Sequence, residues 1–253
     1  QDANNLVRIV HYGDSQLEGD RITEYLRHRF QGQFGGCGVG LVPVTEIENV
    51  RSTLQQEASP NWRKYTVYGN ADFQPTHSNY SLLGSFFRFT PRDNTKEGIH
   101  SADVSYRRTT YGYQRNNQID KLKLLFRNPA APLTINYTFY KTGQTYPVTG
   151  GQDTIPPADN SQLYDLNYNG SFDHIELKFS SSGRPDIYGA AFDCARGIAV
   201  DNIAMRGSSG TAFTRINNTY LKQQLRQLDV RLLILQFGVN TIPNVLTDYS
   251  FYE

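Results

Sequence analysis

The chain reads His11-Tyr12-Gly13-Asp14-Ser15-Gln16-Leu17-Glu18-Gly19-Asp20 directly after an apolar run at 6–10. This pattern predicts a strand that ends in a Gly-Asp-Ser turn and leads into a helix. The turn would place the hydroxyl and backbone N–H of Ser15 at the helix N-terminus. Unpaired N–H groups and the positive end of the helix dipole stabilise developing negative charge there. The position therefore suits a serine nucleophile.

Two later segments repeat this arrangement. The run at 198–204 is apolar at most positions and leads to Gly207, and the run at 230–237 is nearly continuous in apolar residues and leads to Gly238-Val239-Asn240. Continuous apolar strands are typical of parallel sheets that are covered on both faces, so we expect the second run to be buried. Ligands of open parallel sheets bind outside the carboxyl ends of the strands. Ser15, Gly207 and Asn240 are therefore predicted to meet at one edge.

Together the three segments resemble the nucleophile, glycine and asparagine blocks of the SGNH (GDSL-type) hydrolases. The resemblance implies a carboxylic ester hydrolase in which Ser15 attacks an ester carbonyl and becomes acylated. It also implies that the N–H groups of Ser15 and Gly207 and the side-chain amide of Asn240 hold the oxyanion, each about 3 Å away. A side chain at Gly207 would obstruct the approach of substrate. Gly210 competes for this role, since a sequence places a turn only to within a few positions.

The motif that supplies the general base in this family is absent. These hydrolases end with Asp-x-x-His, whereas all five histidines of this chain precede Asn240, and only thirteen residues follow it. We therefore expect the catalytic Asp and His to lie on a missing segment or on a second chain. The alternatives are a degenerate non-enzyme and a borrowed base such as His11. Strand alternation points His11 into the sheet packing, which favours a structural role.

Between about residue 45 and residue 195 the helical period disappears. Helical spacing on either side predicts helices near 22–30 and 216–228. We predict an α/β fold: a flavodoxin-like doubly wound parallel sheet, incomplete at the C-terminus, with an inserted antiparallel β-sandwich or jelly-roll domain. The two parts of the hydrolase core would be 1–45 and 196–253, and the inserted domain 46–195. Short β-branched and aromatic runs between turn formers predict the strands of the insertion at 64–68, 80–90, 102–110, 121–126, 133–140, 172–179 and 186–192.

The predicted insertion is similar to the carbohydrate-binding-like sandwich of SGNH hydrolases that act on acetylated cell-wall glycans. The substrate implied is an acylated glycan that loses O-acetyl or similar small acyl groups. Gln16, Glu18 and Arg206 flank the predicted cleft and are candidate substrate contacts. Tyr111 and Tyr113 are two more, because they alternate onto one face of a turn where their rings can stack on sugars. An inert glycan-binding protein and a lipase or thioesterase for longer acyl chains are the alternatives.

Composition argues against several other classes. The net charge of +1 and the lack of a basic run argue against nucleic-acid binding. No apolar stretch reaches the about 18 residues of a membrane span. Cys37 and Cys194 have no nearby Cys or His that would form a metal site, and no metal or cofactor is predicted.

The two cysteines are expected to be buried free thiols, with a disulfide that staples the ends of the insertion as the alternative. We expect an exported protein, periplasmic or extracellular. This expectation comes from the resemblance and from a composition rich in tyrosine and asparagine.

Overall fold

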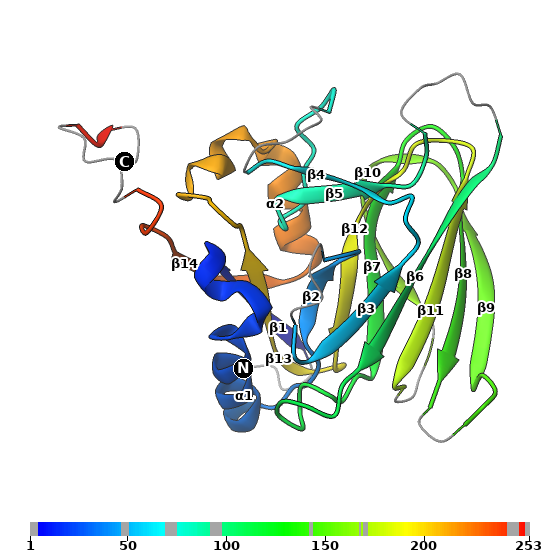
Figure 1. Ribbon diagram of the computed structural model, residues 1–253, viewed down its shortest axis with the longest axis horizontal. Helices are drawn as coiled ribbons and strands as arrows, with labels where there is room; N and C mark the ends of the chain where they lie inside the picture. The colour runs from blue at the N-terminus through cyan, green and yellow to red at the C-terminus, as the bar shows by residue number, and fades with distance from the viewer. Residues whose placement is uncertain are drawn as a thin grey trace.

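The computed structural model describes residues 5–46, 51–68, 75–91, 98–141, 144–166, 168, 172–241 and 248–250. Three sheets organise these residues (Figure 1). The smallest is parallel and has the order β13-β1-β14, formed by Gly197–Ala204, Leu6–Gly13 and Val230–Gln236. All three strands coincide closely with the apolar runs that the sequence identified.

Helices connect the parallel strands. After β1 comes a 3₁₀ helix, η1 (Ser15–Asp20), and then α1 (Thr23–Phe34), which ends at Gly35 with a positive φ of 77°. Between β13 and β14 lie η2 (Thr211–Arg215) and α2 (Asn218–Gln227). Asn217 caps α2, because its side chain accepts hydrogen bonds from the first N–H groups of that helix. The two predicted helices are confirmed.

Two antiparallel sheets contain the remaining strands. In the first, the order is β10-β7-β12-β5-β4, and β2 pairs with β12; its strands are Gly40–Pro43 (β2), Arg63–Thr66 (β4), Ser85–Arg88 (β5), Lys121–Asn128 (β7), Ala158–Leu166 (β10) and Asp186–Asp193 (β12). In the second, the order is β3-β6-β11-β8-β9; its strands are Leu54–Ala58 (β3), His100–Arg108 (β6), Leu133–Tyr140 (β8), Thr149–Ile155 (β9) and His174–Ser181 (β11).

The predicted fold class is wrong. Among the described residues, parallel pairing is confined to three strands, and antiparallel pairing joins all the others, so the chain is mostly β and has no flavodoxin-like doubly wound sheet. The prediction gave too much weight to the two helical segments. Strand β2 adds a further difference, since residues 40–43 pair with β12 in an antiparallel sheet, although the sequence assigned them to the α/β part.

The six-stranded sheet is buried on both faces. One hydrophobic cluster fills the space between the two antiparallel sheets, and a second joins the other face of the six-stranded sheet to β1, β13 and α2. All eight residues of β12 are therefore buried, and Gly189 sits where a Cβ would lie 2.2 Å from the carbonyl oxygen of Val42. The predicted insertion thus shares a core with the parallel sheet.

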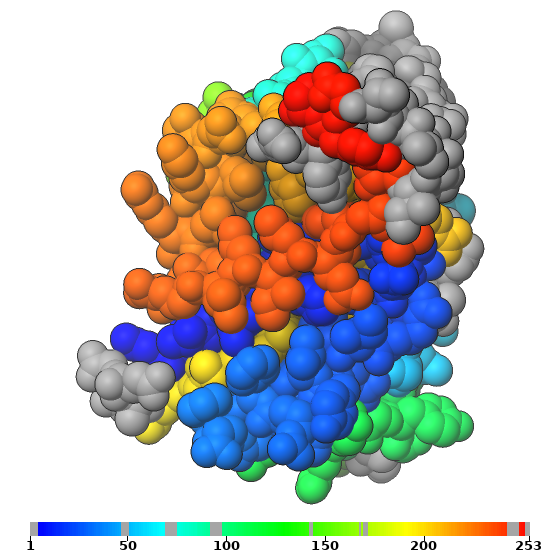
Figure 2. All heavy atoms as spheres, turned by 90° about the vertical axis from the view of Figure 1, so that its left-hand side faces the viewer, coloured from blue at the N-terminus to red at the C-terminus, as the bar shows by residue number. Residues whose placement is uncertain are grey.

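Strand β14 is exposed, contrary to the prediction of a buried strand. Leu232, Leu233 and Leu235 are 47%, 45% and 63% exposed. The reason is its position: β14 is an edge strand, and no described strand lies beyond it. Figure 2 shows the orange-red β14 lying across the surface, between the blue α1 segment and the orange α2 segment.

Four strands were not predicted from the sequence: β2, β3, β9 and β10. Strand β9 reads Thr-Gly-Gly-Gln-Asp-Thr-Ile, and most of its side chains are at least partly exposed at the end of its sheet. Such a strand lacks the apolar alternation by which a half-buried strand is recognised in a sequence. Its pairing with β8 holds it in place instead. No helix in the described ranges is long and apolar enough to cross a membrane.

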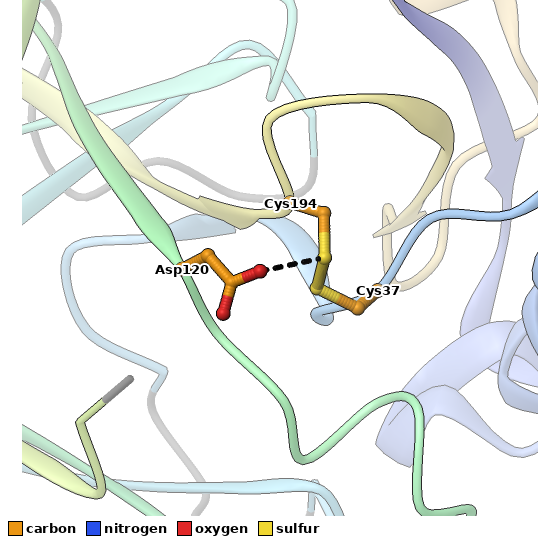
Figure 3. Close-up of side chains that lie close together, drawn as sticks. All are labelled: Cys37, Asp120 and Cys194. Carbon is orange, nitrogen blue, oxygen red and sulfur yellow. Dashed lines mark hydrogen bonds between the residues drawn. A yellow bond between two sulfur atoms is a disulfide. The ribbon is translucent and has the colours of Figure 1, made fainter. Parts of the chain in front are cut away.

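Cys37 and Cys194 form a disulfide, so the expectation of free thiols is wrong (Figure 3). Their Cα atoms lie 5.1 Å apart across a sequence separation of 157. One carboxylate oxygen of Asp120 lies 3.2 Å from Sγ of Cys194. A disulfide sulfur carries no proton, so this is a close contact and not a hydrogen bond. The cluster of Cys37, Asp120 and Cys194 has no free thiolate for a metal ion.

We expect removal of this disulfide to destabilise the protein strongly. Closing a loop of this length restricts the unfolded chain, and the loop-entropy relation gives roughly 5 kcal/mol. The double variant Cys37→Ala, Cys194→Ala should therefore lose about that much free energy of unfolding, measured by urea denaturation. The oxidised wild type, unfolded without reductant, is the reference. A loss below about 1 kcal/mol would contradict the expectation.

Candidate active site

The register of the parallel sheet brings the three sequence blocks to one edge. Gly13 at the end of β1 is opposite Ala204 of β13 on one side and Gln236 of β14 on the other. The Ser15 turn, the 205–210 turn and the 238–240 turn therefore leave the sheet side by side at its carboxyl end (Figure 1). The N–H of Met205 donates to the carbonyl oxygen of Gly13 at 2.8 Å, which ties the first two turns together.

The Ser15 turn is braced by Asp14. The buried Asp14 carboxylate accepts a hydrogen bond from the Gln16 N–H at 2.9 Å and caps η1. Ser15 is half-buried, and its carbonyl oxygen accepts from the Arg21 guanidinium at 2.8 Å.

The predicted helix N-terminus at Ser15 is not present in the expected form. Helix η1 has six residues, and the φ/ψ angles at Glu18 and Gly19 are not helical. The regular helix α1 begins only at Thr23. The helix dipole requires a run of aligned peptide groups, which η1 does not provide. Individual N–H groups and side chains are therefore the donors available for an oxyanion here.

A buried ion pair fixes η1 against the rest of the fold. Asp20, at the end of η1, binds Arg27 of α1 with hydrogen bonds of 2.6 and 3.1 Å and accepts from Asn202 of β13 at 3.0 Å. Arg51 lies 3.6 Å from the same carboxylate. Burial raises the pKa of Asp20, but Arg27 and Arg51 outweigh burial, so its pKa is lower than usual. The carboxylate is charged and links the Ser15 turn to α1 and β13.

This lowered pKa predicts a loss of stability in acid. A carboxyl whose pKa is depressed by folding contributes stability above its unfolded pKa, near 3.8, and that stability is lost as the pH falls through the folded value. The free energy of unfolding should therefore fall on acidification below about pH 4. Asp20→Asn should show a shallower fall and, at pH 7, a loss of about 3–5 kcal/mol from the unpaired Arg27. Identical acid profiles for variant and wild type would contradict this.

The glycine and asparagine turns contact each other. The Asn240 side-chain amide donates to the carbonyl oxygen of Ser208 at 3.0 Å. Gly207 has a φ of +73°, and a Cβ there would meet nothing within 4 Å, so within this chain backbone conformation rather than crowding favours glycine. Gly210 has a φ of +95°, and a Cβ there would lie 3.1 Å from the Phe237 ring. An amide nitrogen carries two N–H groups, so Asn240 has a second donor besides the one on Ser208.

Three of the candidate substrate contacts lie around this edge. Arg206 donates to Glu18 at 2.9 Å, which joins the glycine turn to η1. Gln16 is exposed, and its side-chain oxygen is 3.4 Å from the Gln236 amide. Gln236 was not identified from the sequence. A single polar residue at the end of an apolar run is the signal that would have found it.

Tyr111 and Tyr113 are placed differently. Tyr113 stacks on the His28 ring of α1, with ring centroids 3.8 Å apart, and its N–H donates to Glu24. Tyr111 is 73% exposed. The contacts of Tyr113 are thus with α1 and not with the Ser15 turn.

The histidines hold positions outside the Ser15 turn. Both ring nitrogens of His11 have partners, with Thr23 Oγ1 at 3.0 Å and Gln236 Oε1 at 3.1 Å, and burial lowers the pKa of His11. These contacts suit the structural role expected of it. The other histidines have their own neighbours: His28 stacks on Tyr113, His77 binds Asp186, His100 begins β6, and His174 lies beside Arg107.

Comparison with known proteins gives a fold and no family. No family model matches the chain, and no curated protein matches it. Among solved structures, a peptidoglycan O-acetylesterase is similar with a TM-score of 0.66 and 20% identity over 97% of this chain and 60% of that chain. This chain therefore spans about three fifths of that enzyme's length. At such identity the likeness shows a shared fold alone.

Carbohydrate-binding modules are also similar, at a lower level. A family 29 module in complex with mannohexaose gives a TM-score of 0.34 at 14% identity, over 65% of this chain and 94% of the module. The module TmCBM61 in complex with β-1,4-galactotriose gives 0.33 at 7% identity, over 56% and 87%. These likenesses are too distant to assign a function.

Proposed function

We propose that the protein is a serine esterase that removes O-acetyl or similar small acyl groups from a glycan. One observation carries the proposal: the turns that contain Ser15, Gly207 and Asn240 leave adjacent parallel strands at the same edge. The activity named for the structurally similar peptidoglycan O-acetylesterase agrees with this choice of reaction. The glycan is the proposed partner, and the protein is proposed to act outside the cytoplasm, where disulfides such as Cys37–Cys194 persist.

In the proposed reaction the Ser15 hydroxyl oxygen attacks the ester carbonyl. A tetrahedral intermediate forms, and its oxyanion accepts from the Ser15 N–H, the Gly207 N–H and the free donor of the Asn240 amide. Collapse of the intermediate breaks the bond from the carbonyl carbon to the sugar oxygen, which receives the Ser15 proton from the general base, and leaves an acyl-enzyme. Water then hydrolyses the acyl-enzyme to release acetate or a similar small acid and free Ser15. Gln16, Glu18 and Arg206 surround this edge and are proposed to contact the sugar.

The proposed general base comes from outside the described residues. A serine hydroxyl is a weak nucleophile until a base takes its proton, and His11 is already engaged on both nitrogens. We propose that a further polypeptide, in the same protein or in a second chain, covers β14 and supplies a His and an Asp. The exposed leucines of β14 support this, because parallel strands are normally covered on both faces, and so does its outer edge, with which no described strand pairs.

The test compares two forms of the protein. Residues 1–253 alone should hydrolyse p-nitrophenyl acetate only slowly, because a triad member is missing, and a longer natural form should be faster by about 10³-fold or more. The longer form should also release acetate from an acetylated glycan. Equal rates for both forms would mean that a histidine of this chain is the base. No activity of either form would overturn the esterase proposal and favour an inert glycan-binding protein.

The division into domains is also a proposal. We propose an inserted unit at 46–195 between two parts of the core, 1–45 and 196–253, with residues 40–43 of the first part pairing with β12 of the inserted unit. The disulfide supports it, because Cys37 and Cys194 bring the two ends of the insertion together.

A further inference from the structure

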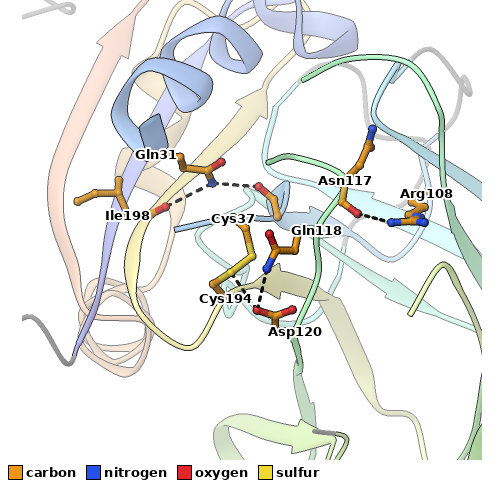
Figure 4. Close-up of a disulfide and its surroundings, with 9 residues drawn as sticks. Gln31, Cys37, Arg108, Asn117, Gln118, Asp120, Cys194 and Ile198 are labelled. Atoms are coloured by element: carbon orange, nitrogen blue, oxygen red, sulfur yellow. Dashed lines mark hydrogen bonds between the residues drawn. A yellow bond between two sulfur atoms is a disulfide. The ribbon is translucent and has the colours of Figure 1, made fainter. Parts of the chain in front are cut away.

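A large open cleft lies at the end of the five-stranded sheet, far from the Ser15 turn. Its volume is about 1160 Å³, and it lies between the loop at 109–120 and the ends of β6, β8 and β11. Ligand sites are usually about 300–1000 Å³, so the space is sufficient for an extended oligosaccharide. Figure 4 shows part of its wall, where Arg108 donates to the carbonyl oxygen of Asn117 at 3.1 Å and Gln118 reaches Asp120.

The position of the cleft separates it from the proposed active site. Asp120 in its wall touches the disulfide, which lies near Gly197 at the amino end of the parallel sheet. Ser15 lies beyond the opposite end of β1. Eight strand residues at about 3.3 Å each put the disulfide and the Ser15 turn roughly 25 Å apart along the strand direction. Only a polymer would occupy both places at once.

Two cations that line the cleft, Arg107 and Lys141, form no ion pair within the described residues. Arg108 forms an ion pair with Asp173, and Glu176 accepts from the Tyr140 hydroxyl at 3.0 Å. Arg107 is exposed, and its hydrogen-bonding neighbour is Nδ1 of His174 at 3.4 Å. No carboxylate in the described part of the chain forms an ion pair with Arg107. Burial and then Arg107 lower the pKa of His174, so the ring is neutral at pH 7 and does not compete for an anion.

The cleft also offers groups that bind sugars. The rings of Tyr140 and His174 stack with centroids 5.0 Å apart and an interplanar angle of 20°, so one face of each ring packs against the other ring. Asn117 and Gln118 provide amide groups nearby. Aromatic faces pack against sugar rings, and amides exchange hydrogen bonds with hydroxyls.

We infer that this cleft binds a carboxylate-bearing glycan strand, with Arg107 as the carboxylate-binding residue and Tyr140 as the contact for a sugar ring. The inference rests on the proposed function for its polymeric substrate, and extends it by naming the charge of the glycan and a second place where it is held. A planar guanidinium suits a carboxylate because two N–H groups can face its two oxygens. Binding here would keep the polymer attached between successive reactions at Ser15.

The test uses hexagalacturonate and its fully methyl-esterified form, which has the same sugars without the charge. Isothermal titration calorimetry at low salt should show binding of the acid form and about 10- to 100-fold weaker binding of the ester, the range for a charge-assisted hydrogen bond. Arg107→Ala should weaken the acid form by a similar factor, and Arg107→Lys by less. Arg226→Ala, which removes an exposed arginine of α2, should leave binding unchanged.

Three results would overturn the inference: no binding by the wild type, equal binding of acid and ester, or unchanged binding by Arg107→Ala. Failure of the esterase proposal is separable from these. Ser15→Ala should bind hexagalacturonate like the wild type, because Ser15 lies outside the cleft. If no form hydrolysed p-nitrophenyl acetate but hexagalacturonate still bound, the esterase proposal would fail and the glycan-binding inference would stand.

Discussion

Ser15→Ala is expected to reduce hydrolysis of p-nitrophenyl acetate by the longer form of the protein by about 10⁴-fold or more. The reason is chemical: the attacking oxygen is lost, while the oxyanion donors remain and give only a small residual rate. Asn240→Ala should reduce kcat by roughly 10²–10³-fold, the usual loss for one oxyanion donor. For both variants, a denaturation experiment checks that the free energy of unfolding equals that of the wild type.

Ser209→Ala is the matched control for Ser15→Ala. Its hydroxyl lies on the same edge, where it contacts Thr211 at 3.2 Å, and it has no part in the proposed reaction. Activity should therefore stay within about twofold of the wild type, since surface substitutions away from special features have small effects. Comparable activity of Ser15→Ala and the wild type would refute a serine mechanism.

Arg8→Met is expected to lower the free energy of unfolding by about 3–5 kcal/mol at pH 7. Arg8 of β1 is buried and donates to Asp201 of β13 at 2.5 Å and to Asp193 at the end of β12. Burial lowers the pKa of Arg8, but the two carboxylates outweigh burial and raise it, so the group stays charged. Removing it leaves two buried carboxylates without their cation, where the parallel sheet meets the antiparallel one.

The loss in Arg8→Met should also depend on pH. Burial raises the pKa of Asp201, and Arg8 is the main group that opposes this. Without Arg8, the pKa of Asp201 in the folded protein rises further above its value in the unfolded chain. The free energy of unfolding of the variant therefore falls as the pH rises through the folded-state pKa of Asp201. The difference between variant and wild type, measured by urea denaturation, should therefore be larger at pH 7 than at pH 4.

Arg231→Met provides the comparison for a surface pair. Arg231 lies 2.6 Å from Asp229, and both side chains are substantially exposed. Exposed pairs contribute about 0–1 kcal/mol, so this variant should lose no more than that. Equal losses of free energy of unfolding in Arg8→Met and Arg231→Met would contradict the expectation that the buried ion pairs of Arg8 stabilise the junction of the sheets.

The sequence by itself determined the local elements around the candidate site. The apolar runs at 6–10, 198–204 and 230–237 coincide with β1, β13 and β14, and helical spacing located α1 and α2. These signals are local, since the period of apolar side chains can be recognised without knowing which segments pack together. The candidate residues Ser15, Gly207 and Asn240 were found in the same way, from the glycine-containing turns that follow each strand.

Tertiary structure decided what these elements build. The exposed leucines of β14 depend on which strand lies at the edge, and an apolar run looks the same in the middle of a sheet as at its edge. Strands β9 and β10 are polar in sequence and are held by pairing with β8 and β7. The bond between Cys37 and Cys194 likewise requires two positions 157 residues apart to meet. Pairing, edge position and disulfide formation are long-range contacts, which no window of sequence contains.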